Sequence, residues 1–519
     1  MLAKVKSVAV YGIDAYLLDI EVYIAAGDMP YVVIVGLPDT AVKESRDRVK
    51  AAINTNGYRF PHKPITINLA PADRKKEGPV FELPIAVGIL IATGQIEIPD
   101  IHEYAIVGEL SLDGRLRPVK GCLSMALKCK ELGIKKFLVP FENASEAAII
   151  DEIDVVPMKT LPDTIGILTK SIPAVPFKVN REEIFKESSS YDIDYADVKG
   201  QEHAKRALTV AVAGNHNIIM VGPPGSGKTM LAQRIPTIMP PLTLGEALET
   251  TKIYSVVGLL NHGQSLIATR PFRAPHHTIS TAGLIGGGSF PRPGEISLSH
   301  NGVLFLDELP EFDRKTLEVL RQPLETGSIT ISRAMSSVTY PSNSVLVASC
   351  NPCPCGFYAD KQRLCRCTPY QIQNYLSKVS GPLLDRIDIQ LEVPAVRYSE
   401  LVAERDVQSS SDMRKKVMIA RSIQKERFKD LSPDCSRGQT SLANAQMSTR
   451  QIKKYCILDK PAEAILHQAM TELGISARGY SKILKVARTI ADLDESEPVR
   501  VEHISEAIQY RNLDRSLWK

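Results

Sequence analysis

The strongest constraint on the fold of this chain is a glycine-rich segment, Gly222–Thr229 (GPPGSGKT), which directly follows the apolar run Asn217–Val221. The segment matches the pattern G-x-x-x-x-G-K-[ST], and Met230–Arg234 behind it is typical of a helix. In such a strand–loop–helix context, backbone N–H groups and the helix N-terminus face a phosphate. The sequence therefore predicts a nucleotide-phosphate site on a sheet of mostly parallel strands, rather than a chance glycine turn.

Two residues of this segment have predicted chemical roles. The ammonium of Lys228 would meet the β and γ phosphates, and the hydroxyl of Thr229 would ligate Mg²⁺. We expect the remaining residues of the loop to contact the nucleotide through their backbone: Gly222, Pro223, Pro224, Gly225, Ser226 and Gly227.

Polar residues that could complete the site follow two further apolar strands. Val303–Leu306 ends in Asp307, which would hold Mg²⁺ through water, and Glu308, which would activate the attacking water. Ser344–Ser349 leads through Cys350 to Asn351. The amide of Asn351 could orient that water at the γ-phosphate, or it could simply cap a turn.

Two arginines lie at the edges of predicted elements. Arg386 lies just ahead of a further strand, in the segment GPLLDRID, and Arg478 opens a helix over Ser481–Asp492. Taken alone, an arginine in such a position more often forms a surface salt bridge than part of a site.

Four of the nine cysteines form a cluster, Cys353, Cys355, Cys365 and Cys367, with two C-x-C pairs separated by nine residues. Four thiolates suit a tetrahedral structural Zn²⁺ site, which would stiffen an otherwise irregular loop. Free surface thiols and a redox disulfide are the alternatives. We expect Cys350, Cys122 and Cys129 to be core residues.

The composition is ordinary for a globular protein, and 519 residues at about 150 per domain predict three to four domains. Apolar β-branched runs alternate with helical stretches over residues 1–172, which predicts an α/β or α+β domain. Residues 173–197 are polar and predict a linker. The predicted nucleotide domain spans 198–395 with the cysteine loop at 350–369, and residues 396–519 are predicted to be helical. We expect strands at Tyr31–Gly36, Ile65–Leu69 and Ala105–Val107 and helices at Thr40–Asn54 and Leu123–Leu132.

Charge and hydropathy limit the possible locations and partners. The net charge of +4 is too small to indicate nucleic-acid binding by itself, although residues 411–460 carry 12 Lys and Arg against 5 Asp and Glu. The longest apolar run, Leu83–Thr93, is about half of the ~20 residues needed to span a bilayer. The N-terminus has no apolar segment of the signal-peptide type. We therefore expect a cytoplasmic protein without a membrane partner.

Together these motifs resemble AAA+ ATPases, and closely resemble the magnesium-chelatase-like YifB/ComM family. Arg270–Leu309 carries the family's most characteristic motif, and Val198–Leu208 (VKGQEHAKRAL) is similar to the AAA+ entry motif beside the adenine pocket. The resemblance covers essentially the whole chain. It implies that Asn351 is sensor 1, Arg386 the arginine finger and Arg478 sensor 2. A finger acts on the nucleotide of a neighbouring subunit, so the resemblance also implies a homo-oligomeric ring, expected to be a hexamer.

The N-terminal domain resembles the Lon-protease catalytic fold. Lys76–Val80 (KEGPV) parallels the Lon motif K-D-G-P-S, and Gly108–Gly114 (GELSLDG) parallels a later strand and turn. However, Val80 occupies the position of the nucleophilic serine, and Leu123 lies near the position of its lysine partner. Neither side chain can perform the covalent chemistry of a protease, so the resemblance implies a non-proteolytic scaffold.

Basic residues in two inserts are candidates for DNA contact. Arg270, Arg273, His276 and His277 lie between the two nucleotide motifs, and Gly327–Tyr340 is expected to form a hairpin around Arg333. In related AAA+ helicases such insertions point into the ring pore, where basic side chains neutralise phosphates without reading sequence. Packing at a subunit interface is the alternative, because no aromatic residues interleave with the basic ones.

The expected architecture is therefore an α/β chain with a Lon-like α+β N-terminal domain, an AAA+ parallel-sheet core and a C-terminal helical lid. The expected cofactors are ATP, Mg²⁺ and structural Zn²⁺. The family resemblance implies an ATP-driven motor on single-stranded or branched DNA, a branch-migration helicase in the uptake and recombination of transforming DNA. A chelatase-type ATPase that remodels a partner protein is the alternative, and an ATP-dependent protease is disfavoured.

Overall fold

The computed structural model describes residues 2–27, 29–180, 184–185, 191–260, 263–288, 290–333, 336–358, 363–396, 408–429, 442–473 and 475–513. The chain divides into two compact units. The first combines Met1–Ser188 with Ala247–Ile267, and the second combines Ser189–Glu246 with Ala268–Lys519. The predicted nucleotide domain included residues 247–267, so the structure differs from the expected boundaries at this segment.

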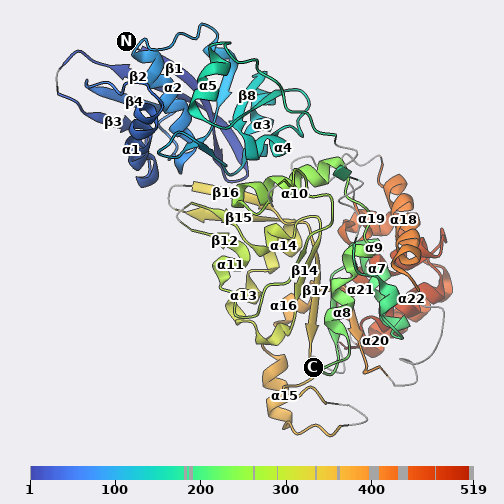
Figure 1. Ribbon diagram of the computed structural model, residues 1–519. Helices are drawn as coiled ribbons and strands as arrows, with labels where there is room; N and C mark the ends of the chain where they lie inside the picture. The colour runs from blue at the N-terminus through green and yellow to red at the C-terminus, as the bar shows by residue number, and fades with distance from the viewer. Residues whose placement is uncertain are drawn as a thin grey trace. The chain divides into compact units, whose positions relative to one another are not determined.

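A seven-stranded mixed sheet forms the centre of the first unit, in the order β3-β4-β2-β1-β5-β8-β9 (Figure 1). Its strands are β1 (Leu2–Tyr11), β2 (Asp14–Ile24), β3 (Val32–Val35), β4 (Ile65–Ala70), β5 (Tyr104–Ile106), β8 (Lys136–Pro140) and β9 (Asp154–Met158). β1 and β2 pair as an antiparallel hairpin, whereas β1, β5, β8 and β9 run parallel to one another. Alternate residues of β2 are buried, as expected for a strand with one face on the core.

The longer helices of the first unit are α1 (Thr40–Thr55), α2 (Glu82–Ala92), α3 (Cys122–Glu131), α5 (Leu161–Leu168) and most of α10 (Leu244–Val257). Of these, α2, α3 and α5 contact strands of this sheet. α2 is almost completely buried because it packs on β1 and β2 and is contacted by α1. Gly88 allows this approach, since a Cβ there would lie 2.8 Å from Cγ2 of Val22. The predicted strands at β3, β4 and β5 and the predicted helices at α1 and α3 are confirmed.

Residues 247–267 belong to the first unit because they complete a buried polar network. The hydroxyl of Ser255 donates to the carboxylate of Glu146, and its carbonyl accepts a hydrogen bond from the Gly121 amide at 3.1 Å. The same carboxylate accepts from the amide of Leu123 at 2.8 Å. Burial raises the pKa of Glu146, and these hydrogen bonds oppose the shift.

A five-stranded, fully parallel sheet forms the centre of the second unit, in the order β11-β14-β17-β10-β18. Its strands are β10 (Ile218–Val221), β11 (Phe272–Arg273), β14 (Val303–Leu306), β17 (Val345–Cys350) and β18 (Ile389–Glu392). The predicted strands at β10, β14 and β17 are confirmed. A mixed α/β unit with a parallel sheet of this kind is consistent with the expected AAA+ fold.

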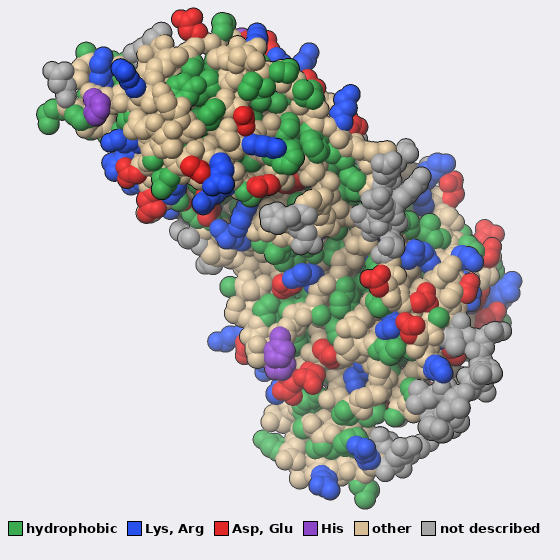
Figure 2. Space-filling view, viewed as in Figure 1, with side chains coloured by type: hydrophobic (Ala, Val, Ile, Leu, Met, Phe, Trp, Pro, Cys, Tyr) green, Lys and Arg blue, Asp and Glu red, His purple; other side chains and the backbone are tan. Residues whose placement is uncertain are grey.

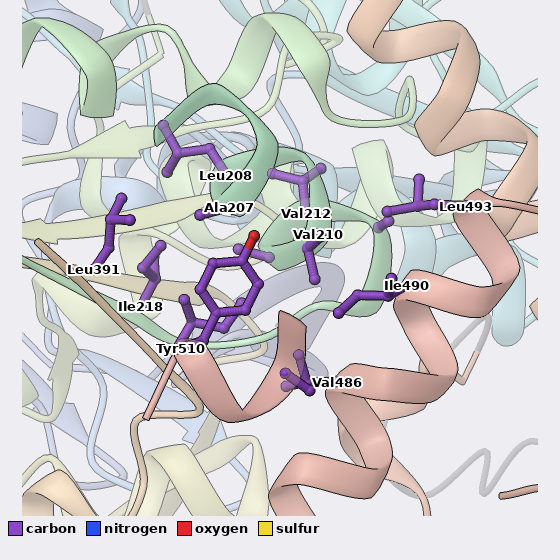
Figure 3. Close-up of a cluster of buried hydrophobic side chains, with 14 of the residues drawn as sticks. Ala207, Leu208, Val210, Val212, Ile218, Leu391, Val486, Ile490, Leu493 and Tyr510 are labelled. Carbon is purple, nitrogen blue, oxygen red and sulfur yellow. The ribbon is translucent and has the colours of Figure 1, made fainter. Parts of the chain in front are cut away.

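The C-terminal helices share one hydrophobic core with this sheet. They are α18 (Ser410–Arg427), α19 (Thr449–Tyr455), α20 (Lys460–Leu473), α21 (Ala477–Leu493) and α22 (Val501–Gln509), and α18 and α21 pack on α7 (Glu202–Gly214). Ile218 and Leu391 from the sheet meet Val486, Ile490 and Tyr510 from the helices (Figure 3). Each such fully buried aliphatic side chain stabilises the fold by about 1.5–3 kcal/mol.

The second unit also contains two small antiparallel ribbons, separate from its parallel sheet. They are β12 (Gly286–Gly287) with β13 (Arg292–Pro293), and β15 (Ser328–Arg333) with β16 (Ser336–Pro341). The second ribbon confirms the predicted hairpin at residues 327–340. Within the described ranges, no helix is both long enough and apolar enough to span a membrane.

Candidate functional site

The glycine-rich loop of the second unit connects β10 to α8 (Lys228–Gln233). Its first residue must be glycine, because a Cβ on Gly222 would lie 2.1 Å from the carbonyl oxygen of Val393. Gly225 and Gly227 have φ angles of +77° and +85°, which other residues adopt only with strain. The loop therefore has the tight curl that the sequence motif predicts.

The Lys228 side chain is directed back over this loop. Its ammonium donates to the carbonyls of Gly222 (2.7 Å) and Pro223 (2.9 Å) and lies 3.3 Å from Oδ1 of Asn351. Only 8% of the residue is exposed, and this burial lowers the pKa of Lys228, while the charge of Asp307 opposes the shift. The structure thus brings the predicted lysine and the predicted strand-end amide together.

Thr229 and Asp307 lie together at one corner of the candidate site. The Thr229 hydroxyl donates to Oδ2 of Asp307 at 2.9 Å, and Oδ1 accepts from the hydroxyl of Ser349. A hydroxyl beside a carboxylate is the oxygen donor set that Mg²⁺ prefers, so these residues fit the expected ion. The role of Ser349 as a support was not predicted, although it ends the strand segment from which Asn351 was identified.

Glu308 has an unusual backbone conformation at the end of β14. Its φ angle is +53°, and its amide donates to Oδ1 of Asp307 at 3.1 Å and to the Ser349 hydroxyl at 3.3 Å. Such strain costs about 1–3 kcal/mol and is often found at functional sites. About half of the Glu308 side chain is exposed, and its Oε2 lies 3.7 Å from Nδ1 of His277. This contact was not predicted.

The two candidate arginines lie together, away from the phosphate loop of their own chain. Arg386 pairs with Glu325 and donates to the carbonyl of Pro382 at 2.6 Å. Arg478 is largely exposed, and its Nη1 lies 3.6 Å from a carboxylate oxygen of Asp385, the neighbour of Arg386. Within the described ranges, the hydrogen-bond and ion-pair partners of both arginines lie outside the loop.

Strand direction explains this separation. β18 pairs in parallel with β10, aligning Ile389 with Ile218, and the side chain of Asn217 donates to the carbonyl of Arg386 at 3.1 Å. Arg386 therefore lies at the start of β10, whereas the phosphate loop follows its end. Four residues of strand span about 13 Å.

The structure corrects part of the predicted DNA-contacting set. Arg270 pairs with Glu246 and donates to the carbonyl of Asn301 at 2.9 Å, and Arg273 makes a bidentate contact of 2.6 and 2.7 Å with Glu295. Both guanidinium groups are thus committed to bonds inside the chain, and we remove them from the candidates. The side chain of the predicted Arg333 lies outside the described part of the structure.

Charges of both signs are mixed on the visible surface. On the face in Figure 2, Lys and Arg side chains are interspersed with Asp and Glu, in keeping with the small net charge. Any local basic surface of this face is therefore small.

The four clustered cysteines meet as the sequence suggested. Their sulfur atoms all lie within 4.8 Å of one another, and that of Cys353 is 3.3 Å from Cys355 and 3.7 Å from Cys365. Four sulfurs held 2.3 Å from a zinc ion would lie about 3.8 Å apart, whereas a disulfide needs about 2.05 Å. Hydrogen bonds from the amides of Phe357 and Arg366 lower the pKa of the Cys355 thiol to about 6, whereas burial raises the pKa of the Cys353 thiol. The cluster therefore fits a structural metal site.

The cysteine loop contacts the phosphate loop directly. Gly356 has a φ angle of +84°, and a Cβ at this position would lie 2.4 Å from Cδ of Pro224. The candidate metal site therefore supports one side of the candidate nucleotide site. No motif in the sequence marked this contact.

Residues at the protease-like positions of the first unit are built into its core. Val80 and Leu123 are both buried, and the ammonium of Lys76 donates to the carbonyls of Pro71 and Arg74. The lysine of the KEGPV motif thus has a structural role in this chain.

Three family models match successive parts of the chain: "Subunit ChlI of Mg-chelatase" over residues 20–143, "Magnesium chelatase, subunit ChlI" over 194–401 and "Magnesium chelatase, subunit ChlI C-terminal" over 407–511.

Two relatives match along their full length. An uncharacterized protein YifB of Salmonella typhimurium is 42% identical over 517 residues, which cover 99% of this chain and 98% of the relative. Competence protein ComM of Haemophilus influenzae is 42% identical over 523 residues, which cover 100% of this chain and 99% of the relative. Lon protease 2 of Bacillus subtilis is 30% identical over 204 residues, 36% of each chain, and the Lon matches fall in the N-terminal region.

Proposed function

This chain belongs to the magnesium-chelatase-like YifB/ComM family of AAA+ ATPases, and from that premise we propose that it is a ring-shaped ATPase motor that acts on DNA in the cytoplasm. The observation that carries the proposal is the convergence of Lys228, Thr229, Asp307 and Asn351 on one loop. These side chains come from three parallel strands and supply the charges that phosphoryl transfer from ATP requires.

Each residue of the site has a distinct task in hydrolysis. Lys228 neutralises charge on the transferred phosphate, and Asn351 orients the attacking water. Glu308 accepts a proton from that water as the bond to phosphorus forms. Thr229 and Asp307 would hold Mg²⁺, which when bound stabilises the charge that develops on the phosphate oxygens.

The placement of the arginines supports hydrolysis across a subunit interface. Arg386 lies at the opposite end of β10 from its own phosphate loop, and its guanidinium contacts Glu325 and the Pro382 carbonyl instead. We propose that Arg386 completes the site of a neighbouring subunit as an arginine finger, and that Arg478, beside it at Asp385, acts as sensor 2 at the same interface. A finger of this kind is typically worth about 10³–10⁵ in rate. The expected assembly is a closed ring, a hexamer.

DNA is the proposed substrate of the motor. A full-length relative is named as a competence protein, and the family resemblance implies branch migration of DNA during transformation and recombination. The β15–β16 hairpin and the exposed His276 are the described elements that we propose for DNA contact. Remodelling of a partner protein is the second candidate, and it is favoured by the chelatase models that match all three regions of the chain. Proteolysis is disfavoured by the buried Val80 and Leu123.

The substitution Glu308→Gln tests the proposed role of Glu308 as the general base. This change keeps the size of the side chain and leaves Lys228, Thr229 and Asp307 in place, so the variant should bind ATP but hydrolyse it at least about 10²-fold more slowly. Single-turnover hydrolysis and retention of radiolabelled ATP on the protein measure both properties. Turnover equal to that of the wild type would contradict the site assignment.

Mixing two inactive variants tests whether Arg386 acts across a subunit interface, as the proposed ring requires. Arg386→Ala subunits keep an intact phosphate loop, and Lys228→Ala subunits keep an intact finger. Mixed rings therefore contain some complete interfaces, and ATPase activity should rise above that of either variant alone. Activity that never rises in any ratio would argue against Arg386 acting in trans.

The substrate is tested with forked and four-way DNA junctions. We expect ATP-dependent unwinding or branch migration by the wild type and none by Lys228→Ala. An active ATPase that neither responds to DNA nor moves a junction would favour the protein-remodelling alternative.

A further inference from the structure

A cavity of the second unit lies at the amino edge of the parallel sheet, the edge at which its strands begin. We propose that this cavity binds a small molecule with a phosphate monoester group, held by Arg421 and Lys425 of α18. The inference goes beyond the proposed function, because the site for ATP hydrolysis is at the opposite edge of the sheet. The cavity has a volume of about 440 Å³, within the usual range for a ligand pocket of about 300–1,000 Å³.

The position of the cavity separates it from the phosphate loop. Asn215, Asn301 and Asn343 line it, and they lie two or three residues ahead of β10, β14 and β17. The phosphate loop follows the carboxyl end of β10, so the length of this four-residue strand, about 13 Å, lies between the two sites. The proposed ligand is therefore distinct from the nucleotide held by the phosphate loop of the same subunit.

α18 presents one row of side chains to the cavity. These side chains follow the i, i+3, i+4, i+7 spacing of a single helix face: Met418, Arg421, Ser422 and Lys425. The adjacent face of the helix is buried in the core that it shares with the sheet: Met413, Val417 and Ala420. The apolar face anchors the helix, so the two basic residues are presented at fixed positions.

Within the described part of the chain, Arg421 is a cation without an ion-pair partner. Its Nε is buried and has no hydrogen-bond acceptor among the same residues. Burial and the nearby charge of Arg270 lower the pKa of Arg421 to about 10, while the charge of Glu246 opposes the shift. The guanidinium remains charged at neutral pH, and buried charges in proteins are normally paired. An anion in the cavity would supply the missing acceptor.

The carboxylate of Glu246, which lines the same cavity, is already neutralised. It lies 3.3 Å from the guanidinium of Arg270 and accepts from the amide of Thr243 at 2.9 Å. Once this ion pair is cancelled, the described lining residues leave two positive charges, those of Arg421 and Lys425. A phosphate monoester carries about −1.5 to −2 charge at pH 7, so it matches this excess better than a carboxylate or a sulfate ester does.

The remaining walls indicate what the phosphate is attached to. Several lining side chains are apolar: Met239, Pro240, Leu242, Met418 and Leu442. An apolar or aromatic body fits against them. A group that bonds to the buried Nε of Arg421 must enter the cavity, which a small molecule does more readily than a nucleic-acid strand.

The test uses phenyl phosphate, which joins a phosphate monoester to an aromatic ring. The protein is first saturated with Mg²⁺ and a non-hydrolysable ATP analogue, so that the phosphate loop is occupied, and phenyl phosphate is then added by isothermal titration. We expect one saturable site per subunit with a dissociation constant of about 1 mM or lower. Phenyl sulfate, which carries a single negative charge, should bind more weakly. The affinity for phenyl phosphate should fall as the pH drops below about 6, where the phosphate loses its second charge.

Two variants and a matched control locate the binding. Arg421→Gln removes the buried donor and should weaken the binding of phenyl phosphate by at least about 30-fold. Lys425→Gln changes an exposed residue and should weaken it by about 2–5-fold. Arg450→Gln makes the same substitution as the first variant at an exposed residue of α19, outside the cavity, and should bind as the wild type does.

Three results would overturn the proposal. The first is the lack of saturable binding to the wild type up to about 10 mM phenyl phosphate. The second is wild-type affinity in a folded Arg421→Gln protein, or in Lys425→Gln if the first variant does not fold. The third is displacement of phenyl phosphate by a thymidine oligonucleotide, which would assign the cavity to nucleic acid instead of a small molecule.

Discussion

Gly356→Ala tests whether the cysteine loop supports the phosphate loop. The substitution adds one methyl group at a position with a φ angle of +84°, where it would lie 2.4 Å from Cδ of Pro224 and 2.7 Å from its Cγ. The left-handed backbone costs an alanine about 1–2 kcal/mol. Relief of the overlap adds about 1–3 kcal/mol, because the methyl group needs space that one of the two loops must provide.

The second of these costs should be visible in ATP binding. If the phosphate loop yields, binding must restore its curl against the overlap, and 1–3 kcal/mol corresponds to a roughly 5- to 150-fold weaker affinity at 1.36 kcal/mol per tenfold. Gly57→Ala is the control, because Gly57 has a φ of +82° and no atom lies within 4 Å of the added Cβ. It carries the backbone cost without the overlap.

Isothermal titration with a non-hydrolysable ATP analogue measures the affinity, and elemental analysis of the same samples measures zinc. Gly356→Ala should weaken binding, whereas Gly57→Ala should leave it within twofold of the wild type (about 0.4 kcal/mol). Unchanged affinity together with an unchanged zinc content in Gly356→Ala would refute the mechanical link between the two loops.

Three other expectations concern single groups. Cys353→Ser should release about one zinc per subunit, as expected for a four-thiolate site, whereas the control Cys122→Ser should retain its zinc. Substoichiometric metal in wild-type protein purified without chelator would contradict the zinc site. The Asn351→Ala variant should bind ATP nearly normally but show a kcat reduced about 10²-fold. A hydrolysis rate equal to that of the wild type in single-turnover assays would exclude the proposed role of Asn351 in orienting the water. Burial alone would raise the pKa of Asp388, but the charge of Lys482 holds it well below its ordinary value. Ionised Asp388 therefore stabilises the fold at neutral pH, and this contribution is lost as the pH falls below about 4. Asp388→Asn should lower the free energy of unfolding by about 3–5 kcal/mol at pH 7 and by progressively less in acid, measured by urea titration.

The nucleotide site could be anticipated from local patterns because each of its residues directly follows a short apolar run. Parallel strands place their carboxyl ends at one edge of a sheet, so Lys228, Asp307 and Asn351 had to converge once the strands were identified. The contacts of Ser349 with Asp307 and of His277 with Glu308 were not predicted. Such contacts depend on which side chains touch across neighbouring strands, and a motif with fixed spacing does not contain that information.

The parts of the fold that were missed depend on distant partners. The hairpin of β1 and β2 was not predicted, although alternate residues of Asp14–Ile24 are apolar and could have indicated a strand. The contact between Ser255 and Glu146 joins residues 109 positions apart, and neither has a local pattern that marks it. Arg270 and Arg273 were assigned to DNA because a basic residue in a loop resembles a binding residue until its internal carboxylate is located.

The capture of residues 247–267 by the first unit has a consequence for synthesis of the chain. The ribosome makes roughly 80 further residues after Ser188 before this segment is complete, which takes about 4–16 s at the usual 5–20 residues per second. During that interval the carboxylate of Glu146 lacks its hydrogen bond from the hydroxyl of Ser255. The N-terminal sheet also lacks its contacts with residues 247–267. The phosphate loop is therefore synthesised before the first unit is complete, and a fragment that ends at Ser188 lacks residues 247–267 of that unit.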